Sequence, residues 1–314
     1  MTFEKNNLDI QWTAPKISDF STIQKGDMPS DKIVINDGNV DKANVIFPEL
    51  LKLLKPIFEA QPNQKAVISV HGGSGVGKSE IGSLIGYYLN DLGIGSYILS
   101  GDNYPHRIPK VNDAERMRVF RENGIKGLVR KGEFTKERNI KLQELQDQGI
   151  DSNPELCKEL PWLAVYQEAG KSGLSNYLGT NNEIDFNEVN HIIAEFKNGA
   201  ESIMLKRMGR EEKELWYDAG DFSNVKVLVI EWTHGNNDNL IGVDIPILLN
   251  STPQETLEHR RSRNRDGATD SPFTMMVLNI EQNLLCSQAH KAKIIVTKAG
   301  DVISYDDYLK LMNE

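Results

Sequence analysis

A doubly wound α/β fold with a mostly parallel, five-stranded sheet is expected for this chain on three grounds. Short apolar runs recur without polar alternation, as they do in parallel strands that are covered on both faces. Segments with helical periodicity separate several of these runs. The first run leads directly into a glycine-rich loop and then into a helical segment. The predicted strands are residues 66–70, 96–100, 225–230, 243–250 and 293–296.

An N-terminal extension, residues 1–63, precedes the first of these strands. Residues 30–36 predict a short strand within it. Residues 45–59 carry apolar side chains at helical spacing, which predicts an amphipathic helix with Pro48 in its first turn and Pro56 at a kink or at its end. We expect this extension to pack on the core of the main domain, residues 64–314.

The stretch 105–220 predicts a helical insertion within the main domain. It is rich in Lys, Glu, Arg and Gln, and no convincing buried strand lies between Asp102 and Asp221. A structureless loop of this length would be implausible, so we expect helices that cover one edge of the domain. After the insertion, Thr252 with Pro253 and Ser271 with Pro272 predict the starts of two further helices. The predicted helices cover residues 113–120, 135–148, 186–198 and 273–287.

Composition limits the classes of function. The 314 residues carry a net charge of −9 and an apolar content of 39%, which supports a core and argues against a nucleic-acid-binding surface. No apolar run approaches the roughly 20 residues that span a bilayer, and the N-terminus does not resemble a signal peptide. With Cys157 and Cys286 expected as reduced thiols, these features predict a cytoplasmic protein without nucleic-acid or membrane partners. The oligomeric state stays open, with a homodimer among the options.

The loop after the first strand reads Gly-Gly-Ser-Gly-Val-Gly-Lys-Ser, which matches G-x-x-x-x-G-K-[ST]. Glycines allow the backbone to approach phosphates, and the positive end of the helix that begins near Lys78 attracts them. Lys78 would reach the β and γ phosphates, and the Ser79 hydroxyl would bind Mg²⁺. Between a strand and a helix, this pattern predicts a P-loop NTPase fold that binds a nucleoside triphosphate. The candidate nucleotide contacts are Gly72, Gly73, Ser74, Gly75, Val76, Gly77, Lys78 and Ser79.

Two acidic residues follow predicted strands at the edge where ligands collect in an open parallel sheet. Asp102 comes after the second strand, where it can accept a proton from an attacking hydroxyl or hold Mg²⁺ through water. An Asx-turn is an equally good explanation of Asp102. Glu231 ends a strongly apolar strand, a position suited to Mg²⁺ or its water shell.

An arginine cluster and a few residues after Asp102 complete the candidates. Arg260, Arg263 and Arg265 lie in an arginine-rich stretch that favours a mobile lid over phosphates, although a solvated basic helix end is the alternative. The residues placed to face an acceptor are Tyr104, His106 and Arg107. Arg107 and the arginines around Arg116 (Arg118 and Arg121) slightly favour an anionic acceptor, unless they are simply exposed.

In this order, the parts resemble the phosphoribulokinase/uridine kinase family of P-loop kinases. The likeness covers roughly residues 65–297 and includes the glycine loop, Ser-x-Asp-x-Tyr at 100–104, the acid at 231 and a lid that ends Arg-Asp. Residues 181–199, and Arg210 with the two glutamates after it, also resemble segments of that family. The resemblance implies that the glycine loop holds ATP, that Asp102 is the base and that Glu231 assists Mg²⁺. It also implies that Arg260, Arg263 and Arg265 belong to the lid.

The chain departs from the family pattern where an acceptor would bind. Asn103 stands where family members usually have Phe, and residues 204–207 replace an expected Pro-x-Tyr-Asp. The helical insertion is longer than in compact uridine kinases, and the first sixty residues have no counterpart. These departures leave the identity of the acceptor open. From the motifs and the resemblance together, we predict a kinase that transfers the γ-phosphoryl group of ATP, with Mg²⁺, to a hydroxyl of a nucleoside, sugar or sugar phosphate. The alternative is a regulatory NTPase switch with a protein partner.

Overall fold

The computed structural model describes residues 12–29, 31–60, 65–258, 261 and 271–313. The chain divides into two compact units. The first unit is drawn from residues 1–104, 185–252 and 285–314, and the second from residues 105–184 and 253–284. Among the described residues, no helix is both long enough and apolar enough to cross a membrane.

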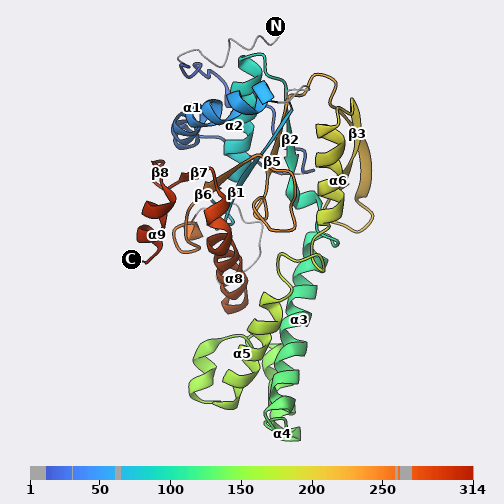
Figure 1. The fold of residues 1–314 in the computed structure, drawn as a ribbon. Helices are drawn as coiled ribbons and strands as arrows, with labels where there is room; N and C mark the ends of the chain where they lie inside the picture. Colours follow the sequence, from blue (N-terminus) through green and yellow to red (C-terminus); the bar gives the residue numbers. More distant parts are fainter. Residues whose placement is uncertain (1–11, 30, 61–64, 259–260, 262–270, 314) are drawn as a thin grey trace. The chain divides into compact units, whose positions relative to one another are not determined.

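A six-stranded sheet forms the centre of the first unit, in the order β2-β5-β1-β6-β7-β8 (Figure 1). All neighbouring strands pair in parallel except β7 and β8, which are antiparallel. The five predicted strands are therefore present, and the predicted count is one short because β8 is too short to show a pattern in the sequence. The strands are β1 (Ala66–Gly72), β2 (Ser96–Ser100), β5 (Val227–Glu231), β6 (Ile245–Leu249), β7 (Ile294–Val296) and β8 (Val302–Ile303).

Helices cover this sheet because its strands are apolar toward both faces. Every residue of β1, β5 and β6 is buried. One face packs against α1 (Asp37–Ala60) and α2 (Lys78–Asp91) in a single core cluster. An aromatic group lies on the opposite face, where Phe186 at the start of α6 (Phe186–Lys197) has its ring centroid 5.3 Å from that of Trp232. Among the described residues, this unit also contains η2 (Phe20–Thr22), η3 (Gly101–Asn103), the end of α8 (Pro272–Gln288), η5 (Ala289–Lys291) and α9 (Tyr305–Asn313).

The N-terminal segment differs from the prediction in two respects. Residues 31–36 form no strand, and α1 begins at Asp37, well before the predicted start at residue 45. Asn36 and Asn39 explain this start, because each side chain accepts a hydrogen bond from the other residue's backbone N–H, at 3.0 and 3.1 Å. Pro48 therefore lies inside α1 instead of in its first turn, and the helix continues past Pro56 to Ala60.

A β-hairpin lies in the interval that was predicted to contain no strand. Strands β3 (Ser202–Met208) and β4 (Leu215–Asp221) pair antiparallel as a separate two-stranded sheet of the first unit. The sequence did not reveal it because β4 is exposed at nearly every position and β3 buries Lys206 and Arg207, so neither strand shows apolar alternation.

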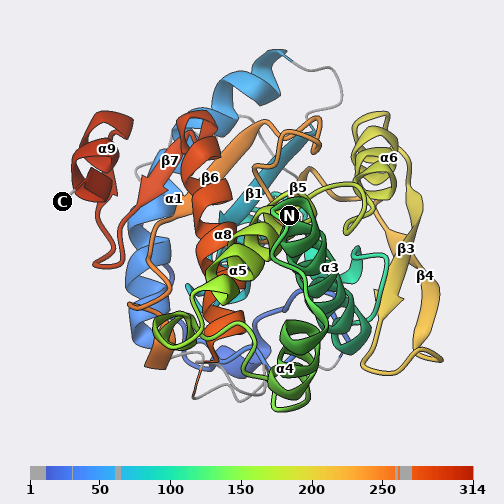
Figure 2. The ribbon, with the colours of Figure 1, turned by 90° about the horizontal axis from the view of Figure 1, so that it is seen from below.

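The second unit is helical. Helices α3 and α5 lie side by side in both views (Figures 1 and 2). Glycines permit this close approach: a Cβ on Gly124 would lie 2.4 Å from the Tyr166 ring, and one on Gly170 would lie 2.6 Å from the Phe120 ring. The helical elements are α3 (Pro109–Arg130), α4 (Lys136–Asp147), η4 (Pro154–Lys158), α5 (Trp162–Ser175) and the first part of α8 (Pro272–Gln288). The helices predicted at 113–120, 135–148, 186–198 and 273–287 are thus all present.

Candidate active site

The strand register brings three candidate segments to one edge of the sheet. Val70 of β1 and Ser100 of β2 both pair with Glu231 of β5, which lies between those two strands. The glycine loop follows β1, and the Asp102 turn follows β2, so both begin beside Glu231. This is the carboxyl edge of the parallel strands, where ligands bind in open α/β sheets.

The glycine loop has the backbone that an anion cradle requires. Gly75 and Gly77 have φ angles of 79° and 96°, which favour glycine. Helix α2 begins directly after Gly77, which has no side chain to cap the first turn, so the positive end of the helix faces the loop. The ammonium group of Lys78 reaches back over the loop and donates to the Gly73 carbonyl at 3.0 Å. Ser74 and Val76 lie in the same loop, and Val76 is buried.

Ser79 and Glu231 form the candidate metal site. Ser79 Oγ donates a hydrogen bond to Glu231 Oε2 at 2.9 Å, and the Glu231 side chain is buried. Burial raises the pKa of Glu231, the nearby charge of Asp102 raises it further, and Ser100, Lys78 and Ser79 oppose the shift. Hydroxyl and carboxylate oxygens are ligands that Mg²⁺ prefers, so these two residues fit the cation. Phosphate oxygens and waters would complete its shell.

Asp102 lies in the short helical turn η3 and is exposed. Its charge acts on buried Glu231, so the two carboxyl groups share one neighbourhood but differ in their access to solvent. An exposed carboxylate beside a candidate metal-binding carboxylate suits proton transfer from an alcohol. The structure therefore brings Lys78, Ser79, Asp102 and Glu231 together, as the sequence analysis predicted.

His71 is a polar residue of this edge that the sequence analysis missed. It is fully buried directly before Gly72, and its Nε2 has no hydrogen-bond partner among the described residues. Burial lowers the pKa of His71 to about 3, and the charges of Lys291 and Lys78 add to that effect, so the ring is neutral. The sequence does carry a sign of this residue: Ser69 and His71 are two positions apart, so they place two polar side chains on one face of an otherwise apolar strand.

The four residues predicted to contact the acceptor are divided between the two units, and they differ in burial and in their hydrogen-bond partners. Tyr104 is completely buried in the first unit. Arg210 is exposed in the turn of the β3–β4 hairpin, where its backbone N–H donates to Glu214 at 2.8 Å. His106 and Arg107 belong to the second unit. There His106 Nε2 lies 2.9 Å from the Asn181 carbonyl oxygen, and Arg107 donates to the Tyr177 hydroxyl at 3.1 Å.

Carboxylates of the second unit neutralise the arginines that had suggested an anionic acceptor. Arg116 Nε lies 2.6 Å from Oε1 of buried Glu183, and Arg121 Nη2 lies 2.9 Å from Oδ1 of buried Asp151. Arg118 is held by two glutamates of its own helix, Glu115 and Glu122. These ion pairs explain the arginines structurally. Of the predicted lid, Arg260, Arg263 and Arg265 lie outside the described residues.

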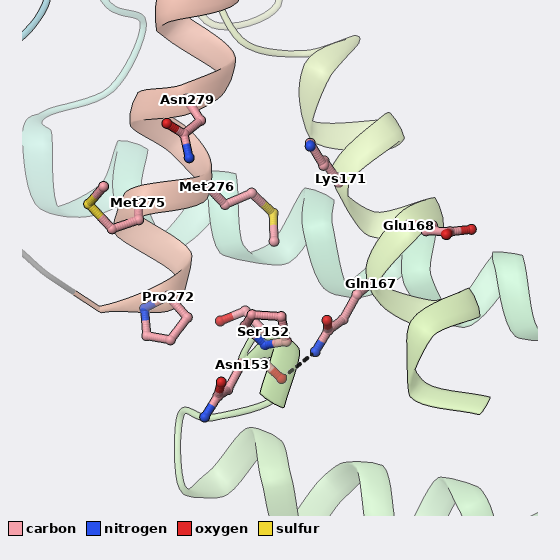
Figure 3. Close-up of a pocket in the computed structure, with 10 residues that line it drawn as sticks. Ser152, Asn153, Gln167, Glu168, Lys171, Pro272, Met275, Met276 and Asn279 are labelled. Carbon is pink, nitrogen blue, oxygen red and sulfur yellow. Dashed lines mark hydrogen bonds between the residues drawn. The ribbon is translucent and has the colours of Figure 1, made fainter. Parts of the chain in front are cut away.

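A pocket of about 510 Å³ lies within the second unit (Figure 3). Part of its wall is the start of α8, with Met275 and Met276. Another part is formed by Gln167 of α5 and Asn153 just before η4, where Gln167 Nε2 donates to the Asn153 carbonyl at 2.9 Å. None of the residues predicted from the sequence to contact nucleotide, metal or acceptor is among its lining residues. The full lining is Ser152, Asn153, Pro154, Gln167, Glu168, Lys171, Pro272, Met275, Met276 and Asn279.

Sequence comparison relates the chain to one curated protein in particular. Over 245 residues it is 41% identical to the bifunctional alpha-galactosidase/sucrose kinase AgaSK of Mediterraneibacter gnavus. The match covers 78% of this chain and 21% of that protein, so the chain spans about a fifth of the length of this relative. No protein-family model matches the chain.

Two solved structures show limited likeness at 12% sequence identity. A provisionally named fructose transport system kinase from Silicibacter sp. TM1040 has a TM-score of 0.43, covering 76% of this chain and 93% of that one. A provisionally named uridine kinase from Bacillus stearothermophilus has a TM-score of 0.41, covering 80% of this chain and 98% of that one. Both scores are below 0.5, so the assignment of the fold depends on the chain's own geometry. The phosphate loop between β1 and α2, and the parallel order β2-β5-β1-β6-β7, place this chain among the P-loop NTPase folds.

Proposed function

We propose that this chain is an ATP-dependent kinase that phosphorylates a hydroxyl group of a small sugar. The observation that carries the proposal is the meeting of Lys78, the Ser79–Glu231 pair and Asp102 at one edge of the sheet. These groups can bind a triphosphate, hold Mg²⁺ and accept a proton, which are the requirements of phosphoryl transfer to an alcohol.

The similarity to AgaSK supports the kinase assignment over the other activity in that protein's name. The match spans 245 of the 314 residues, so it includes residues 72–79 whichever end of the chain it leaves out. The matched sequence therefore contains the phosphate loop, which a kinase requires. Glycoside hydrolysis depends instead on two carboxyl groups that flank a glycosidic bond and has no use for a phosphate loop. The resemblance to the phosphoribulokinase/uridine kinase family points to the same chemistry.

In the proposed reaction, the acceptor oxygen attacks the γ-phosphorus and the bond from that phosphorus to the bridging oxygen of ADP breaks. Asp102 orients the acceptor hydroxyl and takes its proton, while Lys78 binds the β and γ phosphates. Bound Mg²⁺ would supply charge neutralisation at those phosphates from its site at Ser79 and Glu231. Arg260, Arg263 and Arg265 would add positive charge from the lid.

A neutral sugar is the acceptor class that the observations favour. AgaSK is named a sucrose kinase, which supports a sugar. The case for a charged acceptor rested on Arg107 and the Arg116 group, and Arg116, Arg118 and Arg121 already pair with carboxylates. An anionic substrate would therefore have to displace these ion pairs before it gained their charge.

An assay of ADP release with a panel of acceptors tests the proposal. The panel holds sucrose, neutral monosaccharides, nucleosides and sugar phosphates, and mass spectrometry identifies the phosphorylated product. We expect a neutral sugar to stimulate ADP release and to gain one phosphoryl group. Stimulation by sugar phosphates alone would overturn the acceptor class. Stimulation by a protein and by no small molecule would favour the regulatory switch.

The cellular compartment and the oligomeric state are also part of the proposal. We infer a cytoplasmic kinase, and a homodimer is the assembly to test first. Light scattering of the purified chain over a range of concentrations distinguishes a dimer from a monomer.

A further inference from the structure

The N-terminal segment contributes a largely buried carboxylate to the neighbourhood of the candidate active site. Asp27 lies in the first unit ahead of α1, and its side chain is only 11% exposed. Its Oδ1 accepts a hydrogen bond from the Ser100 backbone N–H at 2.8 Å and lies 3.2 Å from the Asn103 amide nitrogen, which donates to it. Ser100 and Asn103 flank the turn that contains Asp102, so one carboxylate oxygen holds both ends of that turn.

Asn103 extends this contact to the hairpin. Its side chain is fully buried, and its Oδ1 accepts a hydrogen bond from the Met208 backbone N–H at 3.0 Å. The amide therefore donates to Asp27 and accepts from the end of β3. A phenylalanine at this position could make neither bond, which gives the departure from the kinase family pattern a structural reason.

The second oxygen of Asp27 is held by Arg207 and Tyr97. Arg207 Nη1 lies 2.8 Å from Asp27 Oδ2, and the Tyr97 hydroxyl donates to the same oxygen at 3.1 Å. Arg207 Nη2 also donates to the Tyr97 hydroxyl at 3.0 Å. The Arg207 side chain is 10% exposed, so this is a largely buried ion pair whose hydrogen bonds are shared among three side chains.

The same segment also approaches the candidate metal ligand. A Cβ added to Gly26 would lie 3.4 Å from Glu231 Oε1 and 3.6 Å from the Ile98 side chain. Residues 26 and 27 therefore lie against both carboxyl-bearing parts of the site, the Asp102 turn and the end of β5. These contacts are all within the first unit.

We propose that Asp27 is a positioning residue of the active site, which fixes the Asp102 turn through Ser100 and Asn103 and is itself held by Arg207. The inference rests on the proposed kinase function for its catalytic consequence. Asp27 touches no reacting atom in this scheme. It acts by holding the base Asp102 at the place where an acceptor hydroxyl would meet the γ-phosphorus, and misplacement by about 1 Å can cost about 10²-fold in rate.

Two substitutions and a matched control test the role of Asp27. Asp27→Ala removes both carboxylate oxygens, whereas Asp27→Asn keeps an acceptor for the Ser100 N–H and removes the charge opposite Arg207. Asp19→Ala is the control, because Asp19 is an exposed aspartate of the same N-terminal segment whose side chain accepts a hydrogen bond from the Ser21 backbone N–H. Each variant is measured in the full chain by kinetics, by ATP-analogue binding and by hydrogen exchange over residues 99–104.

For Asp27→Ala we expect turnover to fall by about 10²-fold, with ATP-analogue affinity within about threefold of the unmodified chain. Exchange over residues 99–104 should accelerate, and Asp27→Asn should give intermediate values in both measurements. Asp19→Ala should match the unmodified chain. The affinity for the analogue reports that the glycine loop remains folded in each variant.

Unchanged exchange over residues 99–104 in both Asp27 variants would overturn the positioning role. Accelerated exchange with unchanged turnover would overturn its catalytic consequence and so the proposal. Absence of phosphoryl transfer in the unmodified chain would refute the proposed function instead. In that case the exchange data would still report whether Asp27 holds the turn.

Discussion

Ser79 and Glu231 are joined by a hydrogen bond of 2.9 Å, from the hydroxyl at the start of α2 to the carboxylate at the end of β5. The two residues are far apart in the sequence, and the parallel pairing of β1 with β5 brings their elements together. The bond links the phosphate loop directly to the predicted acidic metal ligand. It also partly stabilises the negative charge of a carboxyl group that burial makes costly to ionise.

The raised pKa of Glu231 predicts how stability depends on pH. A carboxyl group whose pKa is higher in the folded protein binds its proton more tightly there than in the unfolded chain. Its contribution to the free energy of unfolding therefore falls as pH rises above the ordinary value of 4.5, until the raised folded value is passed. One such group contributes a slope of at most about 1.4 kcal/mol per pH unit. Denaturant unfolding without Mg²⁺, from about pH 5 to about pH 7, measures this slope.

Glu231→Gln is the control for that slope, because glutamine keeps the size of the side chain and cannot ionise. We expect the difference in unfolding free energy between this variant and the unmodified chain to change with pH in the stated direction. Mg²⁺ favours the ionised carboxylate, so the affinity of the unmodified chain for Mg²⁺ with an ATP analogue should rise over the same range. A difference that does not vary with pH would contradict the raised pKa.

Lys78→Ala should abolish detectable phosphoryl transfer while the fold is kept. The ammonium group reaches over the phosphate loop to Gly73, and removing it takes away the charge that would bind the β and γ phosphates. We expect a loss of at least about 10²-fold in turnover, measured by ADP release. Lys213→Ala is the control, since this lysine is 79% exposed and pairs with Glu211. Undiminished activity of Lys78→Ala would remove the phosphate loop from the mechanism.

Asp102→Asn should lower turnover far more than ATP affinity. Asparagine cannot accept the proton of the acceptor hydroxyl, and general-base catalysis contributes typically about 10²- to 10⁴-fold. We expect a fall of that order in kcat, with the affinity for an ATP analogue within about threefold. The exposed Asp91 at the end of α2 offers a matched control as Asp91→Asn. Turnover at the level of the unmodified chain would leave Asp102 with the alternative role of shaping its turn.

Phe47→Ala should destabilise the chain by about 3 kcal/mol or more. Phe47 is fully buried on α1, and its ring centroid lies 4.8 Å from that of Trp12 and 5.2 Å from that of Tyr88 in α2. Val45 on the same helix is 45% exposed, so Val45→Ala should change the unfolding free energy by about 0.5 kcal/mol or less. Equal effects in urea unfolding would show that α1 does not contribute to the core.

The main sheet was predictable because its strands are buried on both faces and therefore read as apolar runs. Elements that depend on other signals were not. The start of α1 depends on the pair Asn36 and Asn39, the hairpin β3–β4 exposes most of one strand, and β8 is only two residues long. Each of these lacks the periodicity that distinguishes strands and helices in a sequence.

Within the candidate site, local patterns were sufficient for Lys78, Ser79, Asp102 and Glu231, because a loop motif and the ends of apolar strands mark them directly. Asp27, Asn103 and Arg207 carry no such mark, and their roles became visible only when the fold brought two distant segments to the largely buried carboxylate of Asp27. The physical reason is that burial makes an ionised group costly unless it is paired. The partners of such a group come from segments that are distant in the sequence and adjacent only in the folded protein. No short stretch of sequence therefore identifies them.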